Sequence, residues 1–347
     1  MDCKVQVWAV DISEFKLWKN DNIKDDGLID SFLPTKEEQD KVRRYVREID
    51  QIRSLTGKIL AHYAVCSTFG DTIWGDIRFQ VGQSGRPYLA KPQHAFDYNI
   101  THDGDWVAIA FARRPSLQQS PPFFTSIGID VMEVHLPSFE QDAESFVETM
   151  EITLTESERK WILDTQPEDS IALVNHQGVS GIEYQNAQES ERLRRLYTLW
   201  TYKEAFTKAH GVGLSFDFSR LELAMWNRHT PQSSILSIQP AQSKGNRDVN
   251  ASDISDTQNC HFDEIHLPPG EFHRSVYLGK ETIKGGGTGS GSILVICSRK
   301  DELQVSQVPH SGMTASQAEK EGLVKMWTLE ELMVKSKECM NGTTKAG

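Results

Sequence analysis

The sequence predicts a mixed α/β protein of the α+β type, made of two similar halves. Predicted strands alternate with predicted helices, and the order of one strand, several helices and further strands occurs twice along the chain. The 347 residues are enough for two units, each with its own buried core. The residues themselves show no repeat, so the duplication is inferred from the order of the elements.

The first half contains a long apolar helical pattern between predicted strands. Apolar residues recur every three or four positions from Val42 to Tyr63, which predicts either one long helix or two abutting ones. Thr35 and Glu38 have capping-box spacing at its start. We predict strands at residues 5–10, 77–81 and 106–111, a turn at 82–87, and a loop at 99–104 that leads into the third strand.

The second half begins after the polar, proline-bearing stretch 113–122. Thr155 and Glu158 form another capping box, and a further helix with an apolar face ends at Gly211. We predict strands at 126–134, 220–225, 275–278 and 292–297. The predicted domains are residues 1–122 and 123–335 with a tail at 336–347, and the second contains polar insertions at 165–190 and 229–260 and a glycine-rich linker at 284–292.

Charge and cysteine content exclude several classes of protein. A formal net charge of -12 argues against non-specific binding to nucleic acid or to anionic membranes. No apolar run approaches the roughly 18 residues of a membrane span, and residues 1–8 show no signal-peptide pattern. The five cysteines are odd in number and widely spread, so we expect reduced thiols and a cytoplasmic protein.

Asp130 is the first candidate functional residue, because it lies inside the apolar strand predicted at 126–134. In an extended strand, Gly128 and Met132 share its face, whereas Glu133 points to the other. An acid in this position serves either a hydrogen bond at the strand end or, as we favour, a ligand site.

Glu204 and Lys208 are four residues apart on a predicted helix and therefore lie on one face. Their ordinary role would be a surface ion pair, worth roughly 0.2–0.5 kcal/mol. With Asp130, however, they provide carboxylate oxygens for a hard divalent cation and an ammonium group for phosphate oxygens. Lys203 lies about 100° away around the helix.

Other polar residues have a structural and a functional interpretation. His102 is either bonded to backbone or, with Thr101, donates to phosphate oxygens. Glu158 is either a capping residue or a catalytic carboxylate. Arg86 belongs either to an ordinary turn or to a ligand contact, and most basic residues on the first long helix form a polar face, from which one or two can reach phosphate.

Two segments in this order resemble the larger, surfactin-type class of 4'-phosphopantetheinyl transferases, and its eukaryotic, fungal-like members in particular. Gly128-Ile-Asp130 resembles the strand motif of that family. Trp200-Thr-Tyr-Lys203-Glu204-Ala-Phe-Thr-Lys208-Ala resembles its helix motif. Four shorter segments also fit, and apart from the insertions the resemblance covers almost the whole chain: Gly85-Arg86-Pro87, Asn99-Ile-Thr101-His102, Asp50-Gln-Ile-Arg53-Ser-Leu-Thr-Gly57 and Met326-Trp-Thr-Leu-Glu-Glu-Leu332.

The resemblance implies a pseudo-twofold fold with coenzyme A bound between the halves. It implies transfer of 4'-phosphopantetheine to a serine of apo acyl or peptidyl carrier domains, with Mg²⁺ as cofactor and 3',5'-ADP as product. The partners would be fatty-acid, polyketide or nonribosomal-peptide synthases, or an aminoadipate reductase, and a monomer is expected. Asp130 and Glu204 would bind the metal, with Glu204, Asp130 and Lys208 as catalytic residues; coenzyme A contacts would come from Lys41, Arg53, Arg86, Pro87, Thr101, His102, Lys203 and Lys208.

One position departs from the family pattern. Bacterial members have a second strand carboxylate where this chain has Met132, so two carboxylates rather than three are expected, with a water in the vacant position. A non-catalytic module that binds coenzyme A or a carrier protein is an alternative function. An unrelated magnesium-dependent nucleotide enzyme is less favoured, because the chain has no Gly-x-x-x-x-Gly-Lys-Ser/Thr loop.

Overall fold

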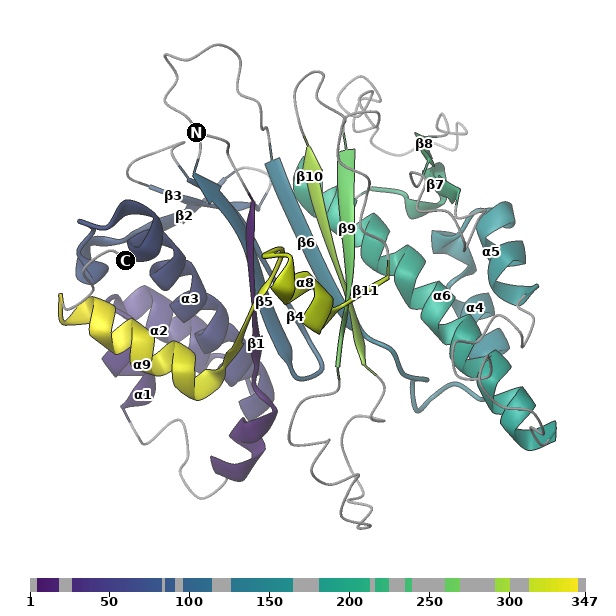
Figure 1. Cartoon of the computed structure of the whole chain (residues 1–347), viewed down its shortest axis with the longest axis horizontal. Helices are drawn as coiled ribbons and strands as arrows, with labels where there is room; N and C mark the ends of the chain where they lie inside the picture. The colour runs from purple at the N-terminus through teal and green to yellow at the C-terminus, as the bar shows by residue number, and fades with distance from the viewer. Residues whose placement is uncertain are drawn as a thin grey trace.

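The computed structural model describes most of the chain in segments: residues 5–18, 27–82, 85–90, 96–113, 126–164, 181–212, 216–224, 235–238, 260–268, 291–299 and 312–342. The structure is an α+β fold with four layers, in which two sheets face each other and each carries helices on its outer side (Figure 1). This mixture of helices and sheets confirms the α+β class predicted from the sequence. Within the described residues no helix is long and apolar enough to cross a bilayer.

The first sheet has the strand order β12-β1-β5-β4. Its strands are β1 (Gln6–Asp11), β4 (Phe96–Asp103), β5 (Trp106–Arg113) and β12 (Lys325–Thr328). The pairs β1–β5 and β5–β4 are antiparallel, while β12 runs parallel to β1. The predicted loop at 99–104 is wrong, because these residues form the end of β4 and its tight turn into β5.

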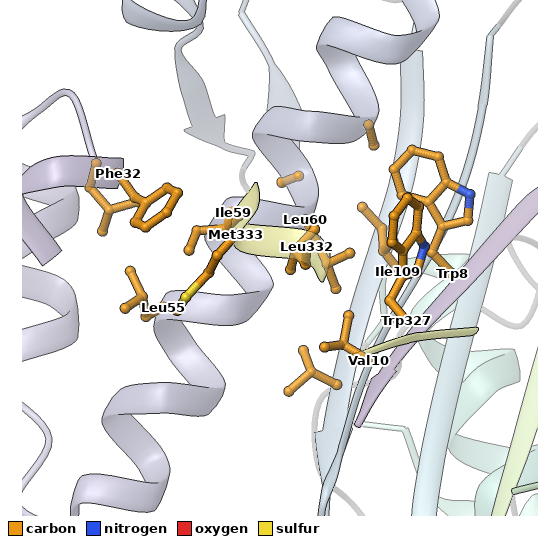
Figure 2. Close-up of a cluster of buried hydrophobic side chains, with 14 of the residues drawn as sticks. Trp8, Val10, Phe32, Leu55, Ile59, Leu60, Ile109, Trp327, Leu332 and Met333 are labelled. Atoms are coloured by element: carbon orange, nitrogen blue, oxygen red, sulfur yellow. The ribbon is translucent and has the colours of Figure 1, made fainter. Parts of the chain in front are cut away.

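Helices cover the outer face of this sheet. The long apolar pattern forms two helices, α2 (Lys36–Arg43) and α3 (Glu48–Phe69), and α1 (Leu28–Phe32) precedes them. The Thr35 side chain caps α2 by accepting from the Glu38 amide. Figure 2 shows the core beneath these helices, where Leu55, Ile59 and Leu60 of α3 meet strand side chains and residues from α9 (Leu329–Met340).

The second sheet has the order β11-β9-β10-β6. It contains β6 (Ser126–Glu133), β9 (Cys260–Leu267), β10 (Ser292–Arg299) and the short β11 (Met313–Thr314). Its outer face is covered by α6 (Gly181–His210), with α4 (Ala143–Thr149) and α5 (Glu156–Leu163) beyond it (Figure 1). The remaining elements are α8 (Ala315–Lys320), β2 (Phe79–Val81), β3 (Pro87–Leu89), β7 (Leu221–Ala224), β8 (Ile235–Ile238) and the 3-10 turns Ser13–Trp18, Trp74–Asp76, Glu151–Thr153 and Phe218–Arg220.

The inner faces of the sheets share one apolar layer. Alternate residues of β5 divide between two environments, because successive side chains of a strand point to opposite faces. Val107, Ile109 and Phe111 pack toward α3. Ala108 and Ala110 pack instead with the apolar side chains of β6, β9 and β10. Small residues on β5 therefore allow the second sheet to approach closely.

The two halves repeat the same strand order. In space the first half has the order β1-β5-β4 and the second has the order β6-β10-β9. Along the chain, the long helix α3 lies between β1 and β4, and the long helix α6 lies between β6 and β9. The twofold relation between the halves stays a prediction.

The predicted division at residue 122 also stays a prediction, although the chain does not keep its halves fully separate. Residues 325–340 return to the first half, where β12 extends the sheet and α9 packs on α3. The predicted strand at 275–278, the stretch 114–125, most of the insertions and most of the linker lie outside the described residues. Within the predicted insertions, residues 181–190 belong to α6, and residues 235–238 form β8.

Candidate active site

Strands β4 and β6 lie side by side and are joined through side chains. Four polar residues at alternate positions of β4 accept hydrogen bonds from backbone amides of β6, each 30 residues further along the chain. The lengths run from 2.8 to 3.2 Å. The edge amides of β6 are thereby satisfied without a backbone partner, as buried N–H groups require. The pairs are Asp97–Ile127, Asn99–Ile129, Thr101–Val131 and Asp103–Glu133.

Asp130 lies in the middle of β6 on the face that meets α6, and it is only 4% exposed. Its Oδ1 accepts from the Thr101 hydroxyl at 3.0 Å and from the Lys208 ammonium at 2.5 Å. Its Oδ2 is buried and has no hydrogen-bond partner in the part of the chain that the structure describes. Burial raises the pKa of this carboxyl, and the positive charge of Lys208 offsets part of the rise. An unpaired buried oxygen on a carboxylate is a binding opportunity for a cation.

Gly128 allows α6 to approach this strand. A Cβ atom built there would lie 1.9 Å from the carbonyl oxygen of Ala205 and 2.4 Å from the amide nitrogen of Ala209. Both atoms belong to the helix backbone, so any side chain at this position would push α6 away. The contact places Glu204 and Lys208, which flank Ala205 and Ala209, over the face of β6 that carries Asp130.

Glu204 is partly buried, and its charge interacts with the charge of Asp130. Burial is the main cause of its raised pKa, the Asp130 carboxylate raises it further, and Lys208 opposes the shift. The two acids therefore lie close enough to influence each other, and Lys208 acts on both. Among the described residues no group of three or more His, Cys, Asp or Glu side chains is arranged to hold a metal ion. Asp130 and Glu204 are the carboxylates of this site that the sequence singled out, and the charge of Asp103 also acts on Asp130.

His102 and Arg53 lie at the same end of β4. His102 reaches the surface, yet partial removal of its imidazole from water lowers its pKa, and Arg53 and Lys208 lower it further. Arg53 comes from α3 and donates to the Gly104 carbonyl at 2.6 Å, while its buried Nε has no hydrogen-bond partner among the described residues. The site thus combines a neutral imidazole with two cations, Arg53 and Lys208, that both act on it.

The remaining predicted ligand residues have protein partners. Lys203 is 1% exposed and donates to Glu158 at 2.6 Å and to the carbonyls of Thr153 and Phe218. Lys41 pairs with Glu37 at 2.7 Å on the surface of α2. Neither lysine contacts the Asp130 cluster through any hydrogen bond of the described residues.

Glu158 performs the structural role that the sequence left open. Its carboxylate accepts from the Thr155 amide, which completes the capping box of α5, and from the Leu223 amide at 2.9 Å. With Lys203 as a third donor, both of its oxygens are engaged in a buried network. Burial lowers the pKa of Lys203, and the Glu158 carboxylate works against that shift.

Arg86 precedes the return strand of the β2–β3 hairpin, and Pro87 begins it. Pro87 is partly exposed and lies opposite Val81. Arg86 has a side chain only 17% exposed, and its guanidinium donates to acceptors in both halves of the protein.

Sequence reasoning missed Asp97 and Asn99, which continue the seam that ends at the site. A signal was present, because Asp97, Asn99, Thr101 and Asp103 are polar at every second position of what proves to be a strand. That pattern was not used, because residues 99–104 were predicted as a loop.

Comparison with known proteins agrees with this arrangement. Residues 27–114 match a family model described as "4'-phosphopantetheinyl transferase, N-terminal", and residues 126–253 match the "4'-phosphopantetheinyl transferase superfamily". The chain is 30% identical over 227 residues to "4'-phosphopantetheinyl transferase pptA" of Paxillus involutus, and the match covers 63% of this chain and 73% of that protein. The chain belongs to the 4'-phosphopantetheinyl transferase family. The family predicted from the two motifs is therefore confirmed.

Other members of the family are matched over a smaller part of their length. The chain is 30% identical over 190 residues to "L-aminoadipate-semialdehyde dehydrogenase-phosphopantetheinyl transferase" of Rattus norvegicus, a match that covers 54% of this chain and 51% of the rat protein. It is 27% identical over 179 residues to "4'-phosphopantetheinyl transferase Sfp" of Bacillus subtilis, with 52% and 61% covered. The chain thus spans between half and two thirds of these two relatives. The matched family regions include Arg53 and His102 in the first, and Asp130 and Glu204 in the second.

Proposed function

We propose that this chain transfers the 4'-phosphopantetheine group of coenzyme A to a serine hydroxyl of an apo carrier domain and releases 3',5'-ADP. The observation that carries the proposal is the environment of Asp130. One oxygen of this buried carboxylate is held by Thr101 and Lys208, the other has no hydrogen-bond partner among the described residues, and the carboxylate is close enough to Glu204 to raise the pKa of that acid. Membership of the family supports the same reaction.

The residues present fit a magnesium ion. The donor set consists of carboxylate oxygens, which Mg²⁺ prefers, and Mg²⁺ commonly uses one or two protein carboxylates together with waters and substrate phosphates. The unpaired Oδ2 of Asp130 and the carboxylate of Glu204 would hold it. When bound, the ion would neutralise negative charge on the diphosphate of coenzyme A and on the departing phosphate.

Basic side chains would hold the phosphates. Lys208 lies nearest to the proposed metal ligands and would bind diphosphate oxygens once the substrate competes for its contact with Asp130. His102 would donate an N–H from its neutral imidazole, since its lowered pKa keeps it uncharged at neutral pH in the free protein. Thr101 would keep the Asp130 carboxylate oriented, and Arg53, whose side chain is 16% exposed, would contact the 3'-phosphate.

The reaction joins the serine oxygen to the phosphorus that carries pantetheine and breaks the bond from that phosphorus to the bridging oxygen, which leaves with 3',5'-ADP. We assign Glu204 as the group that accepts the serine proton, directly or through a water. Burial and the Asp130 carboxylate raise its pKa in the free protein, whereas a bound cation would lower that pKa, which favours proton transfer through a water. Glu158 is a weaker candidate, because its two oxygens are engaged with Lys203 and two backbone amides.

Further parts of the proposal rest on the family alone. Coenzyme A contacts by Lys41, Lys203, Arg86 and Pro87 stay predictions. The carrier would belong to a fatty-acid, polyketide or nonribosomal-peptide synthase or to an aminoadipate reductase, and we propose a cytoplasmic monomer. Free thiols at the described cysteines suit a reducing compartment.

The test is incubation of the protein with coenzyme A, Mg²⁺ and an apo carrier domain, followed by intact mass measurement of the carrier. We expect a phosphopantetheine adduct that disappears with EDTA. Glu204→Gln should lower turnover by at least about 100-fold, the scale of a lost general base, and should still bind coenzyme A. Glu330→Gln, an exposed residue on α9, is the matched control. Full turnover by Glu204→Gln would refute the role of Glu204, and coenzyme A binding without any adduct would support a non-catalytic module.

A further inference from the structure

We propose that Arg86 is a positioning residue that fixes the last turn of α6 against β4 and β6, and thereby sets where Lys208 meets Asp130. The proposal rests on the function proposed above, since it concerns the alignment of that site. It differs from the role expected from the sequence, in which Arg86 contacts coenzyme A.

The guanidinium of Arg86 joins three elements. Nη1 donates to the carbonyl oxygens of Lys208 at 2.7 Å and of Ala209 at 3.2 Å, at the end of α6. Nη2 donates to both carboxylate oxygens of Asp97 on β4 at 3.1 Å, and to the carbonyl of Ile127 on β6 at 2.7 Å. The acceptors are 11 to 123 residues away from Arg86 along the chain. No other side chain of the described residues donates to all three of these elements.

Charge and burial make this contact strong. The last carbonyls of a helix carry partial negative charge, which a guanidinium complements. Asp97 is 7% exposed, so its charge needs a close partner. Its Oδ2 also accepts from the Ile127 amide at 2.9 Å, so Asp97 ties the arginine to the seam between the halves.

The contact controls the position of Lys208 directly, because Arg86 binds the carbonyl of that same residue. Near Gly128, the α6 backbone lies directly on β6. Gly128 therefore sets the distance between helix and strand, and Arg86 sets the position of the helix end. Two fixed points on the last turns of α6 define where the Lys208 ammonium and the Glu204 carboxylate lie relative to Asp130. An error of 1 Å in such an alignment can cost about 100-fold in rate.

The same geometry separates positioning from ligand binding. Both terminal nitrogens of Arg86 already donate to protein acceptors, so a ligand contact would require these bonds to break. Asp97 offers a matched test, because it belongs to the same contact and, being acidic and buried, does not bind a phosphate. If Arg86 acts by positioning, loss of either partner should produce the same kind of defect.

The experiment compares Arg86→Met, Arg86→Lys, Asp97→Asn and the double variant Arg86→Met/Asp97→Asn in the full chain. The matched control is Arg78→Met on the same hairpin, an exposed arginine whose side-chain hydrogen bonds to described residues go to the nearby Gly75 and Ile77 carbonyls. Three measurements are made: steady-state kinetics, which give kcat and KM for coenzyme A, the Kd for 3',5'-ADP, and hydrogen exchange of the amides of residues 206–212.

We expect Arg86→Met to lower kcat by about 100-fold, with less than about a threefold change in the Kd for 3',5'-ADP, and to speed hydrogen exchange at the end of α6 by about tenfold or more. Asp97→Asn should change the same quantities in the same direction. The double variant should be no worse than Arg86→Met, since coupled residues are not additive. Arg86→Lys should restore part of kcat, because an ammonium reaches some of the acceptors but cannot fork across all of them.

A different pattern would overturn the proposal. If Arg86→Met weakened binding of 3',5'-ADP by about tenfold or more while Asp97→Asn left kcat unchanged, Arg86 would be a ligand contact. Unchanged exchange at residues 206–212 in both variants would also refute positioning. The exchange measurement stays decisive if the wild-type protein shows no transferase activity, so failure of the proposed function is distinguishable. If Arg86→Met does not fold, Arg86→Lys and Asp97→Asn decide the question by the same three measurements.

Discussion

Replacing Gly128 by alanine should damage both stability and the proposed activity through one steric contact. The added methyl carbon would lie 1.9 Å from the Ala205 carbonyl oxygen, whereas ordinary van der Waals contact begins at 3.4 Å. The helix must therefore retreat by about 1.5 Å, and since the obstructing atoms are backbone, no side-chain rotation relieves the clash. The retreat carries Glu204 and Lys208 away from Asp130.

Overpacking of this kind costs about 1–3 kcal/mol in stability. Alanine also restricts the unfolded chain, which returns about 0.4–1 kcal/mol. The steric cost is the larger, so Gly128→Ala should lower the free energy of unfolding by about 1–2 kcal/mol. A displacement of more than 1 Å in the site should lower kcat/KM by about 100-fold or more.

Urea unfolding and the carrier-mass assay measure the two effects. Gly75→Ala is the matched control, because nothing lies within 4 Å of a Cβ at Gly75. If Gly128→Ala kept wild-type stability and wild-type turnover, the close approach of α6 to β6 would not be what aligns the site, and the steric reasoning would be wrong.

Three further outcomes follow from buried contacts around the site. Glu158→Gln breaks the buried ion pair with Lys203 and should lower the free energy of unfolding, measured in urea, by about 3–5 kcal/mol. Glu156→Gln, exposed on the same turn, should leave it unchanged. Equal urea midpoints for the two variants would argue against the buried network. Thr101→Val removes the hydroxyl that donates to Asp130 and should lower the free energy of unfolding by about 1–3 kcal/mol in the same assay. Thr101→Ser keeps the hydroxyl and should retain most of the wild-type stability. A valine variant as stable as the wild type would contradict this role. An NMR titration of His102 in the folded protein should give a pKa below the ordinary 6.5. The unfolded state then binds more protons than the folded state between these two pKa values. The contribution of His102 to stability is therefore present above about pH 6.5 and is lost as pH falls through the folded pKa. Bound 3',5'-ADP should raise that pKa, and an unshifted value in the free protein would refute the assignment.

The sequence predicted the elements that carry a strong local signal. The capping boxes at Thr35 and Thr155 begin helices where expected, and Gly211, with φ of 68°, ends α6. The strand of Asp130 was also predicted, together with the face on which its side chain lies, because a period of two residues is legible in an apolar strand. Such features depend on neighbours in the sequence, so periodicity alone reveals them.

The features that the sequence did not predict depend on residues distant in the chain. β9 lies beside β10 at the centre of the second sheet, yet its sequence carries His261, Asp263, Glu264 and His266, so its polar content concealed a strand. Buried Glu264 is stabilised there by Tyr202 and by a neighbouring histidine on its own strand.

The candidate site shows the same limit. Lys203 and Arg86 have the charge expected of phosphate ligands. No feature of the neighbouring sequence distinguishes a lysine that binds a ligand from one that is buried against Glu158. Only the fold reveals that Arg86 donates to residues more than 120 positions away. The residue types predicted the chemistry of the cluster around Asp130. Whether a given lysine or arginine binds a ligand or holds the fold together could be decided only from its hydrogen-bond partners in the structure.

The return of residues 325–340 to the first sheet has a consequence for how the chain folds during synthesis. Until β12 emerges from the ribosome, the outer edge of β1 has exposed hydrogen-bonding groups, and the apolar surface of α3 beneath α9 is uncovered. A nascent chain that contains residues 1–300 but lacks β12 would therefore present an unpaired strand edge to other polypeptides. Truncation before residue 325 should consequently favour aggregation over a stable, soluble fragment.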